Sequence, residues 1–132
     1  MIKYVSPILL LLSFTAASTE NEALNIDQVS VPASDLAFPN DRNIQPTRSS
    51  FMIQNYVLMS NDLGERWGVI TIQNNSAGRR TLSEKHLLAL LADGERIFPH
   101  HFSHSFKAHE TQSITIAFGE NKFPILSIYT LY

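Results

Sequence analysis

Short apolar runs separated by turn-forming residues make up the chain from residue 51 onward. In Phe51–Ser60, Arg66–Gln73 and Ser113–Phe118, apolar residues recur at every second position, a period that is typical of β-strands. Arg66–Gln73 carries apolar residues on both faces, which predicts a central position in its sheet. A closing strand is expected in Phe123–Leu131. The pattern therefore predicts an antiparallel β-structure.

Simple alternation assigns the side chains of the first of these strands to two faces. We expect one face to carry four apolar residues and the other to carry two, namely Phe51, Ile53, Val57 and Met59 against Tyr56 and Leu58. The strand is followed by a turn at Asn61–Gly64, and a second loop is expected at Asn74–Gly78. Both contain Asn and Gly, which tolerate the positive φ values that tight reversals need.

The segment Thr81–Ala92 has two interpretations. Thr81 and Glu84 match a helix capping box, and the leucines and alanines that follow favour a helix. The same residues also alternate over Leu87–Leu91, and Asp93-Gly94 is a strong hairpin signal. We favour a strand and a hairpin, because the neighbouring segments are all expected strands, and we keep a helix as the alternative.

The first 18 residues have the composition of a secretory signal peptide. Lys3 precedes an almost wholly apolar run, Val5–Phe14, and small residues follow at Thr15–Ser18. The apolar run is about ten residues long, whereas a helix needs about twenty residues to span a bilayer. We therefore expect residues 1–18 to be removed and the product to be periplasmic or secreted, with no membrane span after the signal is removed.

The rest of the chain changes in composition at about residue 48. Residues 19–48 are polar and contain three prolines, so we expect an extended or partly disordered segment with one strand in Leu24–Val31. Residues 49–132 are expected to form a single β-sandwich domain. The chain contains no cysteine, which excludes a disulfide, a thiolate metal site and a cysteine nucleophile.

Charge and hydrophobic content add two constraints. A hydrophobic content of 44% is sufficient for an ordinary apolar core. The net charge of −2 becomes −3 once Lys3 is removed, and no basic stripe is present, so nucleic acid is not expected as a partner.

Six or seven short strands predict an all-β fold, an antiparallel sandwich of about seven strands. The strand Val69–Ser76, the Ala92-Asp93-Gly94 hairpin and the passage from His109 into Ser113–Phe118 resemble small bacterial immunoglobulin-like domains over residues 50–131. The resemblance implies that Trp67 is a core tryptophan and that the domain binds or scaffolds other proteins. The chain departs from antibody-type domains by lacking the cysteine pair and a tyrosine corner.

The segment from residue 98 to 109 is unusual, because it contains four of the five histidines and three phenylalanines. Its rings are expected either to pack on the core or to form a partner-binding loop. The residues of such a loop are Phe98, His100, His101, Phe102, His104 and Phe106. The alternative is a metal site formed by His100, His104 and His109.

Geometry limits that metal site. If the segment were a strand, the side chains of His100 and His104 would stand about 13 Å apart at about 3.3 Å per residue, too far to share one ion. Only a helical turn after Pro99 would bring them together.

No catalytic motif is present, neither a Gly-x-Ser-x-Gly elbow nor a phosphate-binding glycine loop, so we expect no enzyme activity and no cofactor. We expect a non-enzymatic exported interaction module, an accessory, assembly or chaperone-like protein that binds a cell-envelope protein. The alternative is a periplasmic inhibitor or immunity protein that inserts the loop at Pro99–His109 into a toxin or hydrolase. Carbohydrate binding by Trp67 or Tyr56 is a further hypothesis.

Overall fold

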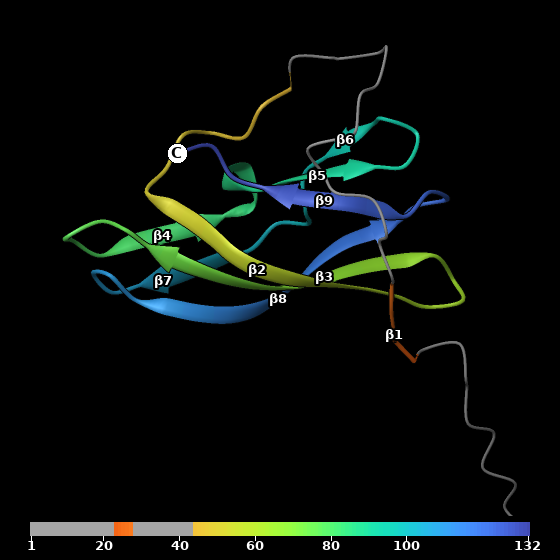
Figure 1. The fold of residues 1–132 in the computed structure, drawn as a ribbon, viewed down its shortest axis with the longest axis horizontal. Helices are drawn as coiled ribbons and strands as arrows, with labels where there is room; N and C mark the ends of the chain where they lie inside the picture. The colour runs from red at the N-terminus through yellow and green to blue at the C-terminus, as the bar shows by residue number, and fades with distance from the viewer. Residues whose placement is uncertain (1–22, 28–43) are drawn as a thin grey trace, which may run out of the picture.

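The computed structural model describes residues 23–27 and 44–132, which form three hydrogen-bonded sheets of four, two and three strands (Figure 1). Every ladder between these strands is antiparallel, and the described part of the chain contains no α-helix. No helical segment within it is long and apolar enough to cross a bilayer. The all-β, antiparallel class is therefore confirmed. The expected signal peptide, residues 1–18, lies outside the described residues.

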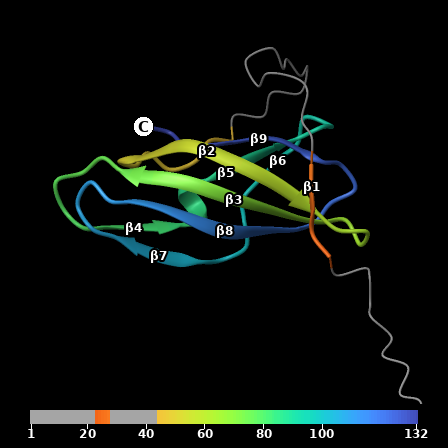
Figure 2. The same ribbon diagram turned by 60° about the horizontal axis from the view of Figure 1, so that its bottom comes forward.

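The largest sheet has the strand order β1-β2-β3-β8. Its members are β1 (Asn25–Ile26), β2 (Phe51–Ser60), β3 (Glu65–Asn74) and β8 (Thr111–Glu120). The long strands β2, β3 and β8 run side by side in Figure 2, with β3 in the middle. The central position expected from the two-sided apolar pattern of β3 is thus confirmed.

The two smaller sheets contain shorter strands. One pairs β4 (Arg80–Ser83) with β7 (Ser103–Phe106). The other has the order β6-β5-β9, with β6 (Arg96–Ile97), β5 (Leu88–Leu91) and β9 (Ile125–Tyr129). The described residues thus hold nine strands rather than about seven, and two of them, β1 and β6, have only two residues.

Residues 81–92 form strands, which confirms the strand-and-hairpin interpretation. A single 3₁₀ turn, η3 (Glu84–His86), separates β4 from β5, and a turn after Leu91 leads into β6. All four residues of β5 are buried. A helix at a protein surface buries only one stripe of side chains, whereas a strand that is covered on both faces buries consecutive residues. The burial of four consecutive residues therefore favours a strand over a helix at this position.

One apolar core joins the three sheets. Its buried members come from all of them: Phe51, Leu58, Ile70, Ile72, Leu82, Leu87, Ala89, Leu91, Phe106, Ile116, Phe118, Ile125 and Ile128. Two sheets approach each other closely at Gly68, where a Cβ atom would lie 2.9 Å from Cδ1 of Ile128. Each fully buried large apolar side chain contributes about 1.5–3 kcal/mol. This packing is compatible with a β-sandwich held together without a disulfide.

A β-bulge in β2 overturns the expected division of its side chains. The register with β3 shifts between Ile53 and Asn55, so one residue is added to β2 and the alternation changes phase. The residues that face the core are therefore Phe51, Ile53, Tyr56 and Leu58, while Val57 and Met59 lie on the outer face. Strict alternation could not reveal this shift.

Part of the expected N-terminal segment is attached to the domain. β1 pairs with Ser60 and Met59 of β2, which confirms a strand in the first half of Leu24–Val31, whereas residues 28–31 lie outside the described residues. Farther along, the amide of Thr47 donates to the carbonyl of Lys85 at 2.8 Å.

Candidate functional site

The aromatic rings of the segment 98–106 do not share one surface. Phe106 is fully buried, and its ring centroid lies 5.2 Å from that of Phe51. Phe102 is half-buried against the core, whereas Phe98 is 42% exposed. Phe106 therefore packs in the core and Phe102 against it, so the three rings do not form one continuous exposed surface. The segment is also not a protruding loop, because Ser103–Phe106 forms β7 and pairs with β4.

The histidines of this segment have separate partners. Nε2 of His104 lies 2.6 Å from Oε1 of Gln112, and Nδ1 of His101 lies 3.1 Å from Oε1 of Glu84. The amide of His100 donates to the carbonyl of Ala117 at 2.9 Å. These contacts attach the segment to β8 and to η3.

The metal alternative finds no support in the arrangement of these side chains. His109 lies in the turn between β7 and β8, with φ of 57°, and its amide donates to the carbonyl of Ser76 at 3.1 Å. The ring of His100 lies beside Gly119, where an added Cβ would meet Nε2 at 2.6 Å. Among residues 23–27 and 44–132, no three side chains of His, Asp or Glu are grouped so that they could hold a metal ion.

Two titratable groups near η3 are perturbed. The hydrogen bond with His101 holds the pKa of Glu84 below its ordinary value of 4.5. Burial, helped by the charge of Lys85, lowers the pKa of His86 below 6.5. Nδ1 of His86 accepts a hydrogen bond from the amide of Ser83 at 3.0 Å, so this nitrogen carries no proton. The neutral ring thus helps to close the 3₁₀ turn.

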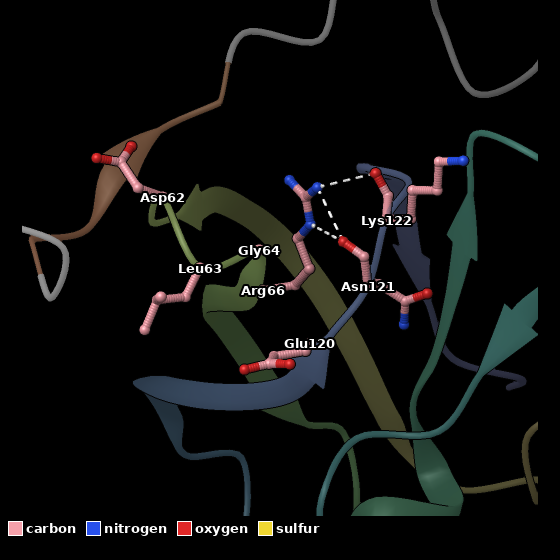
Figure 3. A pocket seen from close by; sticks show the side chains of 7 residues that line it. All are labelled: Asp62, Leu63, Gly64, Arg66, Glu120, Asn121 and Lys122. Carbon is pink, nitrogen blue, oxygen red and sulfur yellow. Dashed lines mark hydrogen bonds between the residues drawn. The ribbon is translucent and has the colours of Figure 1, made fainter.

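A hollow lies at the end of the largest sheet, between the β2–β3 and β8–β9 turns (Figure 3). Arg66 dominates it, because Nε and Nη2 donate to the carbonyl of Asn121 at 3.2 and 3.1 Å. Nη1 also lies 3.9 Å from Oδ2 of Asp27. The guanidinium is therefore used to fasten the β8–β9 turn and the β1 region to β3, which gives this hollow a structural role.

The outer face of the largest sheet carries an apolar patch. Antiparallel pairing places Met59 opposite both Ile26 and Trp67, and Trp67 opposite Ala117. In the adjacent row Val57 stands opposite Val69. We call this set, Ile26, Val57, Met59, Trp67 and Val69, the outer patch; Ile26 is 70% and Val57 42% exposed.

Trp67 therefore lies on the outer face and does not belong to the buried core cluster, so its expected role as a core tryptophan is wrong. The buried positions of β3 are instead Gly68, Ile70, Ile72 and Asn74. The indole Nε1 is buried and has no hydrogen-bond acceptor within the described residues. A buried indole N–H normally finds an acceptor.

The second surface is a groove between β2 and β9. Its lining combines residues of both strands with the C-terminal residues that follow β9: Met52, Ile53, Gln54, Asn55, Tyr56, Ile128, Tyr129, Thr130 and Tyr132. The lining contains no Asp, Glu, Lys, Arg or His residue. We call it the β2–β9 groove. No sequence pattern indicated it, because β2 and β9 are distant in the chain and the groove depends on where the two sheet edges meet.

Comparison with known proteins adds no family to these observations. No protein-family model matches the chain, and the searches of curated proteins and of solved structures gave no match either.

Proposed function

We propose that the chain is an exported, non-enzymatic interaction module with an immunoglobulin-like sandwich, which binds another protein of the cell envelope. The proposal combines three features: a leader with the composition of a signal peptide, a small cysteine-free β-domain, and a sequence without a catalytic motif. Its location in a periplasm or outside the cell follows from the leader and is part of the proposal.

The outer patch is the single observation that carries this proposal. In most sheets a second layer covers the large apolar side chains of at least one face. β3 carries apolar residues on both of its faces, a pattern typical of strands that are covered on both faces. Its inner residues are buried in the core, whereas Trp67 and Val69 on the outer face are half-buried. Contiguous exposed apolar surface is typical of protein interaction sites, and tryptophan often dominates their binding energy. A partner on the outer patch would supply the missing cover.

Affinity capture from the envelope fraction tests the proposal. The processed protein is used as bait beside two variants, Val57→Glu in the outer patch and Thr111→Glu at the far end of the same face. Both positions are exposed, so both variants should fold. We expect wild type and Thr111→Glu to retain the same envelope protein and Val57→Glu to lose it. Retention of no protein above the level of an empty column would contradict the proposed function.

A further inference from the structure

We propose that residues 44–49 form a strap that mild acid releases from the domain, and that His86 is the group that takes up the proton. The release is a property of the chain itself and does not depend on the proposed function. The proposal rests on the contacts that join the strap to the 3₁₀ turn η3, and on the position of one imidazole nitrogen within that turn.

Within residues 23–27 and 44–132, main-chain hydrogen bonds attach the strap at two places. Near its start, the amide of Thr47 donates to the carbonyl of Lys85 in η3 at 2.8 Å. At its end, the amide of Ser49 donates to the carbonyl of Leu131 at 3.0 Å. Pro46 is buried, although its neighbours on both sides are exposed. The first attachment therefore holds Pro46 against the domain, and it depends on where η3 places the carbonyl of Lys85.

The turn η3 is held mainly by a side chain. Hydrogen bonds in 3₁₀ turns have poorer geometry than those in α-helices. The bond that closes η3, from the amide of Leu87 to the carbonyl of Glu84, is 3.3 Å long, beyond the usual range of about 2.7–3.2 Å. The amide of Ser83 makes a shorter contact of 3.0 Å with Nδ1 of His86. This imidazole therefore fixes the turn, and with it the carbonyl of Lys85.

Protonation of His86 is incompatible with that contact. A neutral imidazole has one nitrogen that accepts and one that donates, whereas the protonated ring donates from both. Nδ1 would then direct a hydrogen at the amide hydrogen of Ser83, so the ring has to turn away and the amide loses its acceptor. The carbonyl of Lys85 is then no longer held towards Thr47, and the strap detaches at its start.

The surroundings of the ring favour its neutral form while the strap is closed. Burial and the charge of Lys85 lower the pKa of His86, and the charge of Glu84 acts in the opposite direction. The groups of β2 and β4 that lie against the ring are uncharged. They are the ring of Phe51, with its centroid at 5.7 Å, and the hydroxyl of Ser83, 3.4 Å from Nδ1.

Two further charged or titratable side chains lie close to these elements. Arg48 of the strap donates from Nη1 to the main-chain oxygen of Tyr132 at 2.8 Å, which belongs to the second attachment. His101 contacts Oε1 of Glu84 at 3.1 Å and so touches η3 from the segment before β7. Because His101 is itself titratable, its effect has to be separated from that of His86 by a variant.

The direction of the response follows from the pKa of His86. In the open state the ring is exposed to water and regains its ordinary pKa of 6.5, so opening takes up a proton below that pH. The equilibrium constant for opening then rises by up to about tenfold per pH unit. The strap is therefore closed above pH 6.5 and opens progressively as the pH falls from there to the pKa of the closed state.

Hydrogen exchange of single amides, followed by NMR and corrected for the intrinsic pH dependence of exchange, tests the proposal. Between about pH 7.5 and about pH 5, we expect the protection of the Thr47 amide to fall at least about fivefold, and that of Ser49 by less than about twofold. This range stays above the ordinary pKa of Glu84, 4.5. An unchanged Thr47 amide, or an equal loss at Ser49, would overturn the proposal.

Two variants identify the group that responds. His86→Gln keeps an acceptor for the amide of Ser83 but cannot be protonated, so the protection of Thr47 should no longer depend on pH. His101→Ala is the matched control and should keep the response of wild type. A response that survives in His86→Gln, or that disappears in His101→Ala, would contradict the role of His86.

A titration of wild type alone decides the matter if His86→Gln does not fold. The ring protons of His86 and the amide of Thr47 are followed by NMR over the same pH range. We expect both curves to share one midpoint, below 6.5, because opening and protonation are one event. Two different midpoints, or an amide of Thr47 that does not respond, would overturn the proposal.

Discussion

The side-chain amide of Asn74 donates to the main-chain carbonyl of Lys107 at 3.0 Å and so joins the end of β3 to the turn before β8. The same nitrogen donates to the carbonyl of Gly78 at 2.9 Å. Its oxygen accepts hydrogen bonds from the amide of Ser76 at 3.0 Å and from the hydroxyl of Ser50 at 3.2 Å. Asn74 is fully buried, so one side chain satisfies the polar groups of three chain segments.

Removal of this amide should destabilise the fold. In Asn74→Ala, two part-buried carbonyls and one part-buried amide lose a partner, and an unsatisfied buried group costs about 1–3 kcal/mol. We expect the free energy of unfolding to fall by about 2–4 kcal/mol in urea titrations. The control Asn55→Ala, at an exposed position, should stay within about 0.5 kcal/mol of wild type. Equal effects of the two variants would contradict the role of Asn74.

Two phenylalanines of the segment 98–106 should respond very differently to truncation. Phe106→Ala removes a fully buried ring and should cost about 3–5 kcal/mol. Phe98→Ala removes a ring that is 42% exposed and should cost clearly less. Urea titration of both variants measures the difference. Similar losses would contradict the assignment of Phe106 to the core and Phe98 to its margin.

His86 should make stability depend on pH. Because its folded-state pKa lies below the ordinary value of 6.5, the unfolded chain binds a proton at higher pH than the folded one. The stability that its neutral ring contributes is complete above pH 6.5 and is lost as the pH falls from there through the folded-state pKa. In His86→Gln, which keeps an acceptor for the amide of Ser83, this dependence should disappear. Urea titrations at a series of pH values test it, and identical pH profiles would refute it.

Glu84 and His101 should be coupled in titration. The hydrogen bond with His101 lowers the pKa of Glu84. The stability that the ionised Glu84 contributes is therefore present above the ordinary pKa of 4.5 and is lost as the pH falls through the folded-state pKa. In His101→Ala the pKa of Glu84 should rise towards 4.5, as followed by NMR of the carboxyl carbon. An unchanged titration of Glu84 would exclude the contact as its cause. His109→Ala, at an exposed turn, is the matched control.

The period of the sequence was sufficient to predict the strands but not their faces. Phe51–Ser60 is a strand with the expected bounds, yet one added residue at Gln54 reverses the faces of Tyr56 and Val57. A bulge leaves no mark in a pattern of apolar and polar residues, because both phases contain apolar side chains.

The segment Thr81–Ala92 carries local signals for both a helix and a strand. The expected capping box of Thr81 and Glu84 does not form: Ser83 is the N-cap and His86 its partner, and they close a single 3₁₀ turn at Glu84–His86 instead of starting a long helix. Burial of the whole of β5 then decides for a strand. Such burial depends on residues distant in sequence, for example the ladder between Leu88 and Tyr129.

The candidate surfaces were the least predictable part of the molecule. The histidine and phenylalanine segment is unusual in composition, but its side chains divide between the fold and the surface: Phe106 is buried and His104 contacts Gln112, whereas Phe98 and three of the four histidines are exposed. In the sequence, the outer patch corresponds only to the second apolar face of β3, a feature that a central position in the sheet also explains. Whether a second layer covers that face is a property of the tertiary structure.

The single tryptophan of the chain offers the most direct test of the outer patch as the binding surface. Protein labelled with 5-fluorotryptophan gives one ¹⁹F resonance, from Trp67, which can be followed while the captured partner is added. We expect the resonance to shift on binding to wild type and to Thr111→Glu, and to stay unchanged with Val57→Glu at the same partner concentration. Saturating binding that leaves the Trp67 resonance of wild type where it was would contradict the proposal.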